Sequence, residues 1–293
     1  MKFTIKHTTQ YSYNQSVDLC HSEARLLMRE CSNQRSISSN IKISPAPQGY
    51  HERLDYFGNK VAFFSLQQPH KQLIVTALSE VEVLNNNLII NMASISWEDV
   101  LAQMRYTQAP LTELPLVQIY ALDSALAAAS MEIKAYAAES FQPGRTISAV
   151  AEDLTQRIYQ DFSYDPTFTT IATPLATVLE HKRGVCQDFA HLAIACFRSF
   201  GLPARYVSGY IETTPPPGVV KLAGSDASHA WFSFFQPDYG WQDYDPTNNC
   251  KTGEQHITLA WGRDYNDVTP LKGLAIGSSQ QQISVAVDVH RQI

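Results

Sequence analysis

The hydrophobic pattern of the chain changes its period near residue 97. Before that point apolar and polar residues alternate, as in residues 2–6 (KFTIK) and 37–43 (ISSNIKI), and proline, glycine and asparagine separate the runs. Alternation of this kind is typical of strands that bury one face. The sequence therefore predicts an antiparallel β domain over residues 1–97, with a hairpin turn within residues 55–61.

After this β domain the pattern predicts a linker and then a mixed domain. Residues 98–116 combine prolines with polar residues and are interpreted as the linker, and residues 117–293 are assigned to the second domain. Its first part is predicted to be helical, because the Ala-rich residues 120–129 have strong helix propensity. Further helices are expected at residues 148–160 and 174–183, and strands at residues 204–211, 229–235, 240–244 and 283–289.

One further helix is marked by its periodicity and by its end signals. Apolar residues recur at spacings of three and four from Phe189 to Phe200, which is the period of a helix with one buried face. Gly201 is placed to end this helix, and Pro203 prevents its continuation. The sequence therefore predicts a buried helix that begins at or near Cys186.

The composition excludes several classes of protein. The 293 residues are 44% apolar and 17% charged, which is typical of a globular chain rather than a disordered one. The formal net charge of −6 argues against a nucleic acid or an anionic membrane as the main partner. No apolar run approaches roughly 18 residues, and the first residues lack the apolar core of a secretory signal, so we expect a cytoplasmic location.

The cysteines are odd in number, scattered and without a CxxC pair. This usage fits neither a disulfide framework nor a zinc ribbon, so each cysteine is judged as a single thiol. The two in the β domain and the one inside the predicted helix are expected to be ordinary structural thiols. The five are Cys20, Cys31, Cys186, Cys196 and Cys250.

Cys186 differs from the others in its place at the start of a helix. Unpaired N–H groups and the positive end of the helix dipole favour a thiolate there. Gly184 allows a close backbone approach, and the backbone N–H of Cys186 would be available to a developing oxyanion. Cys196, inside the same helix, has neither advantage. Cys186 is therefore the candidate nucleophile.

A cysteine nucleophile needs a base, and the base needs a group that fixes its tautomer. His229 opens one predicted strand and Asp245 ends the next, so a hairpin between the two strands would place them roughly opposite one another. His229 is the candidate general base and Asp245 the group that orients it. Taken singly, each would be interpreted as structural, because strand histidines and Asp-Pro turns are common.

Three sequence blocks in this order also carry a family resemblance: residues 184–190 (GVCQDFA), 228–231 (SHAW) and 245–248 (DPTN). They resemble the motif blocks of the bacterial transglutaminase-like superfamily, which includes cysteine proteases. The resemblance is strong over residues 145–270, and residues 1–97 are similar to the β-rich region that precedes the catalytic domain in the bacterial subgroup. It implies a papain-like α+β fold, with the nucleophile helix packed on an antiparallel sheet, and a Cys–His–Asp triad.

Two neighbouring residues are candidates for supporting the site. Asp188, in the first turn of the helix, complements the helix dipole but opposes a thiolate, so we assign it a structural hydrogen bond. Trp231 could form a wall of the cleft or pack beneath the imidazole of His229. His181 and His191 are interpreted as structural. No ligand pair has a structural-zinc spacing and the calcium motif DxDxDG is absent, so neither a metal nor another cofactor is expected.

The sequence leaves three functions open. The first is hydrolysis of a peptide or related amide through an acyl-enzyme, and the second is transfer of the same acyl group to an amine, as in a transglutaminase. The third is a non-catalytic binding protein that retains the fold. The expected partner is a peptide or protein amide, bound near a loop at residues 212–225, and apolar strands in the β domain leave room for a homodimer.

Overall fold

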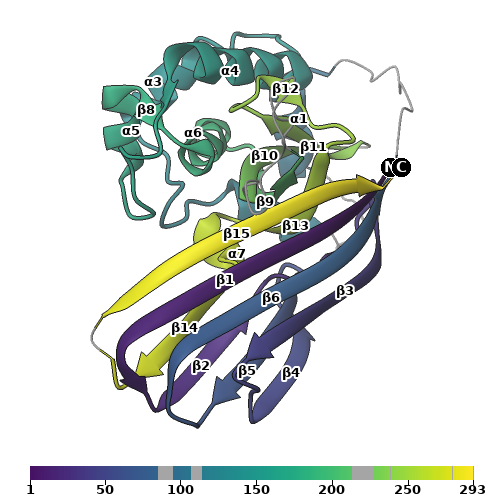
Figure 1. The fold of residues 1–293 in the computed structure, drawn as a ribbon. Coiled ribbons are helices and arrows are strands. Elements are labelled where there is room, and N and C mark those ends of the chain that lie inside the picture. The colour runs from purple at the N-terminus through teal and green to yellow at the C-terminus, as the bar shows by residue number, and fades with distance from the viewer. Residues whose placement is uncertain (85–94, 107–113, 213–227, 238, 279, 293) are drawn as a thin grey trace, which may run out of the picture.

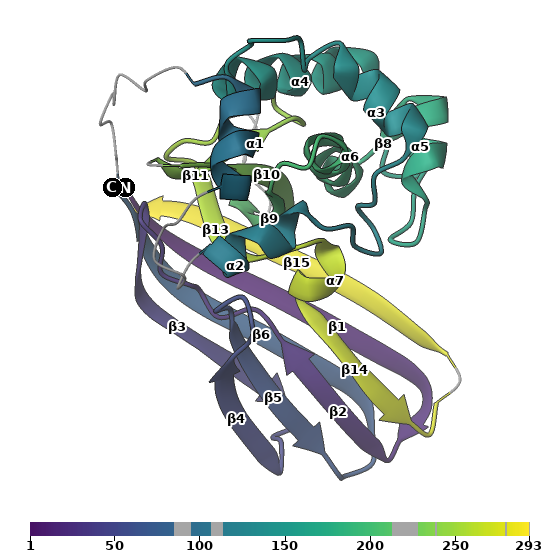
Figure 2. The same cartoon turned by 180° about the vertical axis from the view of Figure 1, so that it is seen from behind.

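The structure, a computed structural model, describes residues 1–84, 95–106, 114–212, 228–237, 239–278 and 280–292. Two four-stranded antiparallel sheets form one half of the molecule, and helices around a five-stranded sheet form the other half (Figure 1). In Figure 2, where the molecule is seen from behind, the other four-stranded sheet lies in front, with short helices at the junction of the two halves. The predicted α+β class and the β-rich N-terminal region are confirmed.

Many of the apolar residues in the four-stranded sheets are buried, and others, such as Ile283 and Val285, are exposed. In β1 (Lys2–Val17), Phe3 and Ile5 are buried and Lys6 is exposed, as the alternation predicts. The hairpin turn at residues 55–61 is also confirmed: it joins β4 to β5, with Gly58 at a φ of 74°. The remaining strands are β2 (Leu19–Ala24), β3 (Gln34–Ser44), β4 (Gly49–Leu54), β5 (Lys60–Leu66) and β6 (His70–Val83).

The C-terminal strands complete these two sheets, which differs from the predicted division of the chain. β15 (Gln281–Gln292) pairs with β1, and β14 (Leu271–Ile276) pairs with β2. The sheet orders are β15–β1–β6–β3 and β14–β2–β5–β4. Residues 271–292 therefore lie with the N-terminal strands and not with the rest of residues 117–293. Alternation predicted a strand at residues 283–289, but alternation does not specify which strand it pairs with.

The segment between the two halves is more helical at its start and less helical in its Ala-rich part than predicted. α1 (Trp97–Tyr106) and α2 (Leu114–Gln118) occupy much of the predicted linker. The Ala-rich residues continue only as a 3-10 turn, η1 (Ile119–Ala121), and regular helix resumes at α3 (Met131–Ala138). The backbone oxygens of Tyr120 and Ala127 accept hydrogen bonds from a buried arginine, so tertiary contacts override helix propensity here.

The second half places one helix against an antiparallel sheet, as predicted. α6 (Cys186–Ser199) packs on β10 and β9, with Phe197 stacked on Phe234 at a centroid distance of 5.3 Å. The sheet order is β12–β11–β10–β9–β13. Its strands are β9 (Ala204–Ile211), β10 (Ser228–Gln236), β11 (Gly240–Asp245), β12 (Cys250–Lys251) and β13 (His256–Gly262). The other elements are α4 (Ile147–Asp161), α5 (Leu175–His181), α7 (Tyr265–Val268) and the short parallel pair β7 (Ser163–Tyr164) and β8 (Arg183–Gly184).

Candidate active site

Cys186 is the first residue of α6, as the sequence predicts, and its side chain is half-buried. The turn before it is held by Asp188, whose Oδ2 accepts hydrogen bonds from the backbone N–H of Val185 (2.9 Å) and from the hydroxyl of Thr169 (2.7 Å). Burial raises the pKa of Asp188. A side chain at Gly184 would place its Cβ 2.9 Å from this carboxylate. The geometry fits the supporting role expected of Asp188 and explains why glycine precedes the turn.

His229 lies between Cys186 and Asp245. Its Nε2 donates a hydrogen bond to Asp245 Oδ2 at 2.7 Å, and its ring also forms a side-chain hydrogen bond with Cys186. The hairpin register pairs Phe232 with Tyr244, so Asp245 is two residues from the position directly opposite His229, and the side chains span this offset. Since Nε2 contacts Asp245, Nδ1 is the ring nitrogen left for the thiol. The three predicted residues are thus brought together in the order that their predicted roles require.

His229 and Asp245 stabilise each other in their charged forms. Burial acts to lower the pKa of His229, but the hydrogen bonds with Asp245 and Cys186 outweigh it and raise the pKa to about 10. Burial likewise acts to raise the pKa of Asp245, yet the hydrogen bonds from His229 and His256 hold it well below its usual range. This electrostatic arrangement favours an imidazolium beside a fully ionised carboxylate, which suits an ion pair with a thiolate.

Two further side chains bind Asp245, and sequence reasoning missed both. Asn248, in the DPTN block, donates through Nδ2 to Asp245 Oδ2 at 2.6 Å. His256, at the start of β13, donates through Nε2 to the same oxygen at 3.1 Å. The backbone N–H of Gly253 points at His256 Nδ1 (3.2 Å), so Nδ1 is the acceptor and the ring proton lies on Nε2. Asn248 could have been found from its place in the block, whereas nothing local in the sequence marks His256.

One ring nitrogen of His229, one of His256 and one carboxylate oxygen of Asp245 all lie within 4.8 Å of one another, a spacing that a metal ion could use. The hydrogen bonds argue against this use. A metal would need the lone pair of His256 Nε2, but that atom carries the proton because Nδ1 accepts from Gly253. Both imidazoles already direct N–H groups at Asp245 Oδ2. These three residues therefore fit a hydrogen-bonded cluster better than a metal site.

Trp231 is fully buried and packs beneath the imidazoles rather than forming an open wall. Its ring meets His256 edge to face at a centroid distance of 5.3 Å and lies 6.1 Å from the ring of His229. Its Nε1 donates to Asp243 Oδ2 at 3.2 Å. Of the two interpretations that the sequence left open, the structure supports packing beneath the site.

The other predicted structural residues lie away from this chemistry. Cys196 is fully buried within α6, and burial raises the pKa of its thiol to about 12. His191 is buried and accepts a hydrogen bond from the backbone N–H of Tyr265, and burial lowers its pKa to about 3. His181 is exposed at the end of α5. The loop expected to bind substrate, at residues 212–225, lies almost entirely outside the described residues.

Gly209 is required by the packing under the site. It pairs with His229 across β9 and β10, and an added Cβ would lie 2.2 Å from the backbone oxygen of Ile257 and 2.4 Å from the ring of Trp231. We expect Gly209→Ala to lower the free energy of unfolding by roughly 1–3 kcal/mol, measured by urea denaturation. Gly253→Ala is the matched control, since its Cβ would meet open space, and should change stability by less than about 0.5 kcal/mol. Equal effects of the two changes would contradict this account of the packing.

Comparison with known families agrees with this geometry. Residues 3–82 match the bacterial transglutaminase-like N-terminal region, and residues 134–246 match the transglutaminase-like superfamily. An uncharacterized protein of Mycobacterium tuberculosis is 37% identical over 98% of this chain and 92% of its own length. A similar protein of Mycobacterium leprae is 33% identical over 99% of both chains. The chain therefore belongs to the transglutaminase-like superfamily.

Two more distant similarities bear on fold and function. A crystal structure from Cytophaga hutchinsonii, described as a "putative cysteine protease", has a TM-score of 0.73 with 17% identity and covers 98% of this chain and 90% of its own. This similarity shows the fold. A protein-glutamine gamma-glutamyltransferase of Pseudomonas aeruginosa is 30% identical over 35% of this chain and 17% of its own length.

Proposed function

We propose that this protein is a cysteine-dependent acyl-transfer enzyme that acts on amide bonds through Cys186, His229 and Asp245. The observation that carries the proposal is the position of His229, which hydrogen-bonds to Cys186 on one side and to Asp245 on the other. A nucleophile, a base and an orienting carboxylate in this arrangement are what acyl transfer requires.

The reaction follows from the roles of the three side chains. The Cys186 thiolate attacks the carbonyl carbon of the amide, and the imidazolium of His229 gives its proton to the departing amine. The acyl group is then held as a thioester on Cys186. As the first residue of a helix, Cys186 has a backbone N–H without an intrahelical acceptor, which suits a developing oxyanion. Asp245 keeps the imidazole in the required orientation throughout.

The fate of the thioester separates a hydrolase from a transglutaminase. Attack by water, with His229 as the base, releases an acid, and attack by an amine gives a new amide. We favour hydrolysis of a peptide or related amide. The 30% sequence identity to a protein-glutamine gamma-glutamyltransferase over about a third of this chain supports the second outcome as the alternative. Turnover of an amide substrate with and without an added primary amine, with products identified by mass spectrometry, distinguishes them.

A non-catalytic binding protein is the remaining alternative. In such a protein the three side chains would have no reason to remain connected, whereas here His229 and Asp245 are both buried and hydrogen-bonded. Keeping an ionised carboxylate buried is unfavourable unless its partners stabilise it. The retained network favours an enzyme.

The remaining expectations about partners and location stay predictions. Among the described residues, no helix is long and apolar enough to cross a membrane. We propose a cytoplasmic protein that acts on a peptide or protein amide without nucleic-acid or membrane partners, and we keep a homodimer as a proposal that analytical ultracentrifugation tests.

The thiol of Cys186 should react with iodoacetamide well below pH 8, because the imidazolium beside it persists to about pH 10 and stabilises a thiolate. The rate of modification, followed across pH by peptide mass spectrometry, should fall by about tenfold or more at pH 6 in His229→Ala. Cys250 serves as an internal control, since burial raises the pKa of its thiol to about 11. Equal profiles for the wild type and His229→Ala would favour the binding protein.

A further inference from the structure

β13 is the edge strand of the five-stranded sheet, and its outer edge faces the N-terminal half of the molecule. One edge of β13 pairs with β9, from His256 to Gly262. The N–H and C=O groups of the other edge need partners once they are buried. Two side-chain amides from the N-terminal half supply these partners in place of a further strand.

The first of these amides belongs to Gln34, which begins β3. Its Nε2 donates to the backbone oxygen of Thr258 at 2.8 Å, and the backbone N–H of Thr258 donates to its Oε1, also at 2.8 Å. Nε2 also donates to the backbone oxygen of Arg29 at 3.0 Å. Gln34 is only 2% exposed. A carboxamide that pairs with both groups of one residue reproduces the contacts of a neighbouring strand.

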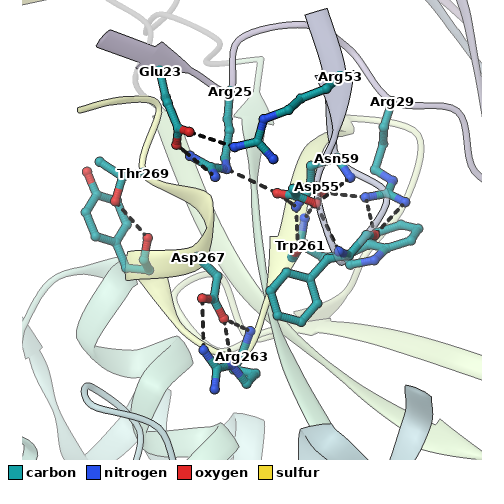
Figure 3. Close-up of polar contacts among 12 residues, drawn as sticks. Glu23, Arg25, Arg29, Arg53, Asp55, Asn59, Trp261, Arg263, Asp267 and Thr269 are labelled. Carbon is teal, nitrogen blue, oxygen red and sulfur yellow. Dashed lines mark hydrogen bonds and ion pairs between the residues drawn. The ribbon is translucent and has the colours of Figure 1, made fainter. Parts of the chain in front are cut away.

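The second amide belongs to Asn59 in the hairpin between β4 and β5 (Figure 3). Its Nδ2 donates to the backbone oxygen of Trp261 at 2.8 Å, and the backbone N–H of Trp261 donates to Asn59 Oδ1 at 2.9 Å. Asp55 fixes the orientation of this amide by accepting from Asn59 Nδ2 at 3.0 Å. Arg29 donates to Asn59 Oδ1 and stacks on the indole of Trp261, 3.2 Å from its centroid.

The strand held in this way carries His256, two residues before Thr258. His256 is buried and donates to Asp245 Oδ2, the oxygen that also accepts from His229. The ring of His256 is fixed on its other side by the backbone N–H of Gly253. A continuous set of hydrogen bonds and strand pairs therefore leads from the N-terminal half to Asp245.

We propose that His256 is a positioning residue that holds Asp245 toward His229, and that Gln34 and Asn59 of the N-terminal half keep β13, and with it His256, in place. This inference rests on the proposed function, since it assigns the N-terminal half a part in orienting the same triad. His256 touches no reacting atom. It acts by keeping one carboxylate oxygen directed at the imidazole, which in turn sustains the ion pair with Cys186.

Two substitutions of His256 separate positioning from packing. His256→Gln retains an N–H donor at a similar reach, and His256→Leu retains an apolar side chain of similar bulk without the donor. We expect the rate of iodoacetamide modification of Cys186 at pH 6 to fall about tenfold in His256→Leu, with its pH midpoint raised by about one unit. His256→Gln should stay within about threefold of the wild type. A purely structural role would affect both variants equally.

The contacts of Gln34 and Asn59 with β13, here called the clamp, are tested with Gln34→Leu and Asn59→Ser. Each variant removes one side-chain amide from the outer edge of β13. Either variant should raise the pH midpoint of iodoacetamide modification at Cys186, as His256→Leu does. Val75→Ala, a truncation in the buried core of β6, which pairs with β1 and β3 and not with β13, is the matched control for general loss of stability. It should leave the midpoint unchanged. Should one clamp variant fail to fold, the other tests the same strand edge.

The outcomes distinguish this inference from the proposed function. An ordinary thiol profile in the wild type would overturn both. A reactive wild type whose profile is unchanged in His256→Leu would overturn the inference alone. Faster modification in His256→Leu would also overturn it, because that result would mean that His256 only withdraws charge from Asp245 and weakens the imidazolium. If the pH midpoint of Cys186 modification shifted in His256→Leu but in neither clamp variant, the N-terminal half would be removed from the proposal.

Discussion

Cys186→Ala should abolish turnover of an amide substrate, with a loss of about 10⁴-fold or more, while the free energy of unfolding changes by less than about 2 kcal/mol. The thiol is half-buried at the end of a helix, so its removal leaves no large cavity. The chemistry, in contrast, has no second nucleophile within this network. Turnover by liquid chromatography and stability by urea denaturation of the same preparation measure the two effects.

Cys196→Ala is the matched control, since it removes the same thiol ten positions along the same helix. Cys196 is fully buried and has no contact with His229 or Asp245 among the described interactions. We expect the opposite pattern: activity within about twofold of the wild type and a loss of roughly 1–2 kcal/mol of stability. Substantial turnover by Cys186→Ala would disprove the assignment of the nucleophile.

The parts of the site that were predictable from sequence are those that local patterns specify. The start of α6 at Cys186 followed from the helical period and from Gly201, which ends the helix with a φ of 77°. The proximity of His229 and Asp245 followed from two strands separated by a short turn. In both cases residues close in the sequence determine the geometry, so periodicity and turn chemistry are sufficient.

The parts that were not predictable depend on contacts between distant segments. Nothing in the alternation of β15 indicates that it pairs with β1, about 280 residues away, since any half-buried strand has the same pattern. His256 reaches Asp245 only because β13 pairs with β9. A lone histidine in a strand gives no sign of this. The N-terminal amides that meet β13 are likewise visible only in three dimensions.

The Ala-rich residues 120–129 show how a tertiary contact can override a local preference. Arg198 of α6 is 4% exposed, and its guanidinium donates to the backbone oxygens of Tyr120 (2.9 Å) and Ala127 (2.8 Å) and to the hydroxyl of Ser124 (2.8 Å). A continuous helix would use these carbonyl oxygens for its own hydrogen bonds. The non-helical conformation of residues 120–129 therefore depends on the buried guanidinium of Arg198.

Arg198→Leu should lower the free energy of unfolding by roughly 4 kcal/mol or more. Besides its contacts with the Ala-rich segment, the guanidinium donates to the backbone oxygens of Ala204 (3.0 Å) and Arg263 (2.7 Å). Leucine fills the apolar part of the space but leaves five buried or half-buried oxygen atoms without this donor. The positive charge of Arg198 is also stabilised by the carboxylate of the nearby Asp264, and Asp264 would lose this counter-charge in the variant. Chemical denaturation followed by circular dichroism measures the loss.

Two further substitutions make the result specific. Arg198→Lys keeps the charge but has three donors on one atom, so it cannot reach oxygens on all sides, and we expect it to recover less than half of the loss. Arg53→Ala removes an exposed arginine, 49% accessible, whose ion pair with Glu23 should contribute no more than about 1 kcal/mol. If Arg198→Leu were as mild as Arg53→Ala, the five hydrogen bonds would not be what holds residues 120–129 against α6. In that case another contact would have to explain why an Ala-rich segment does not form a helix.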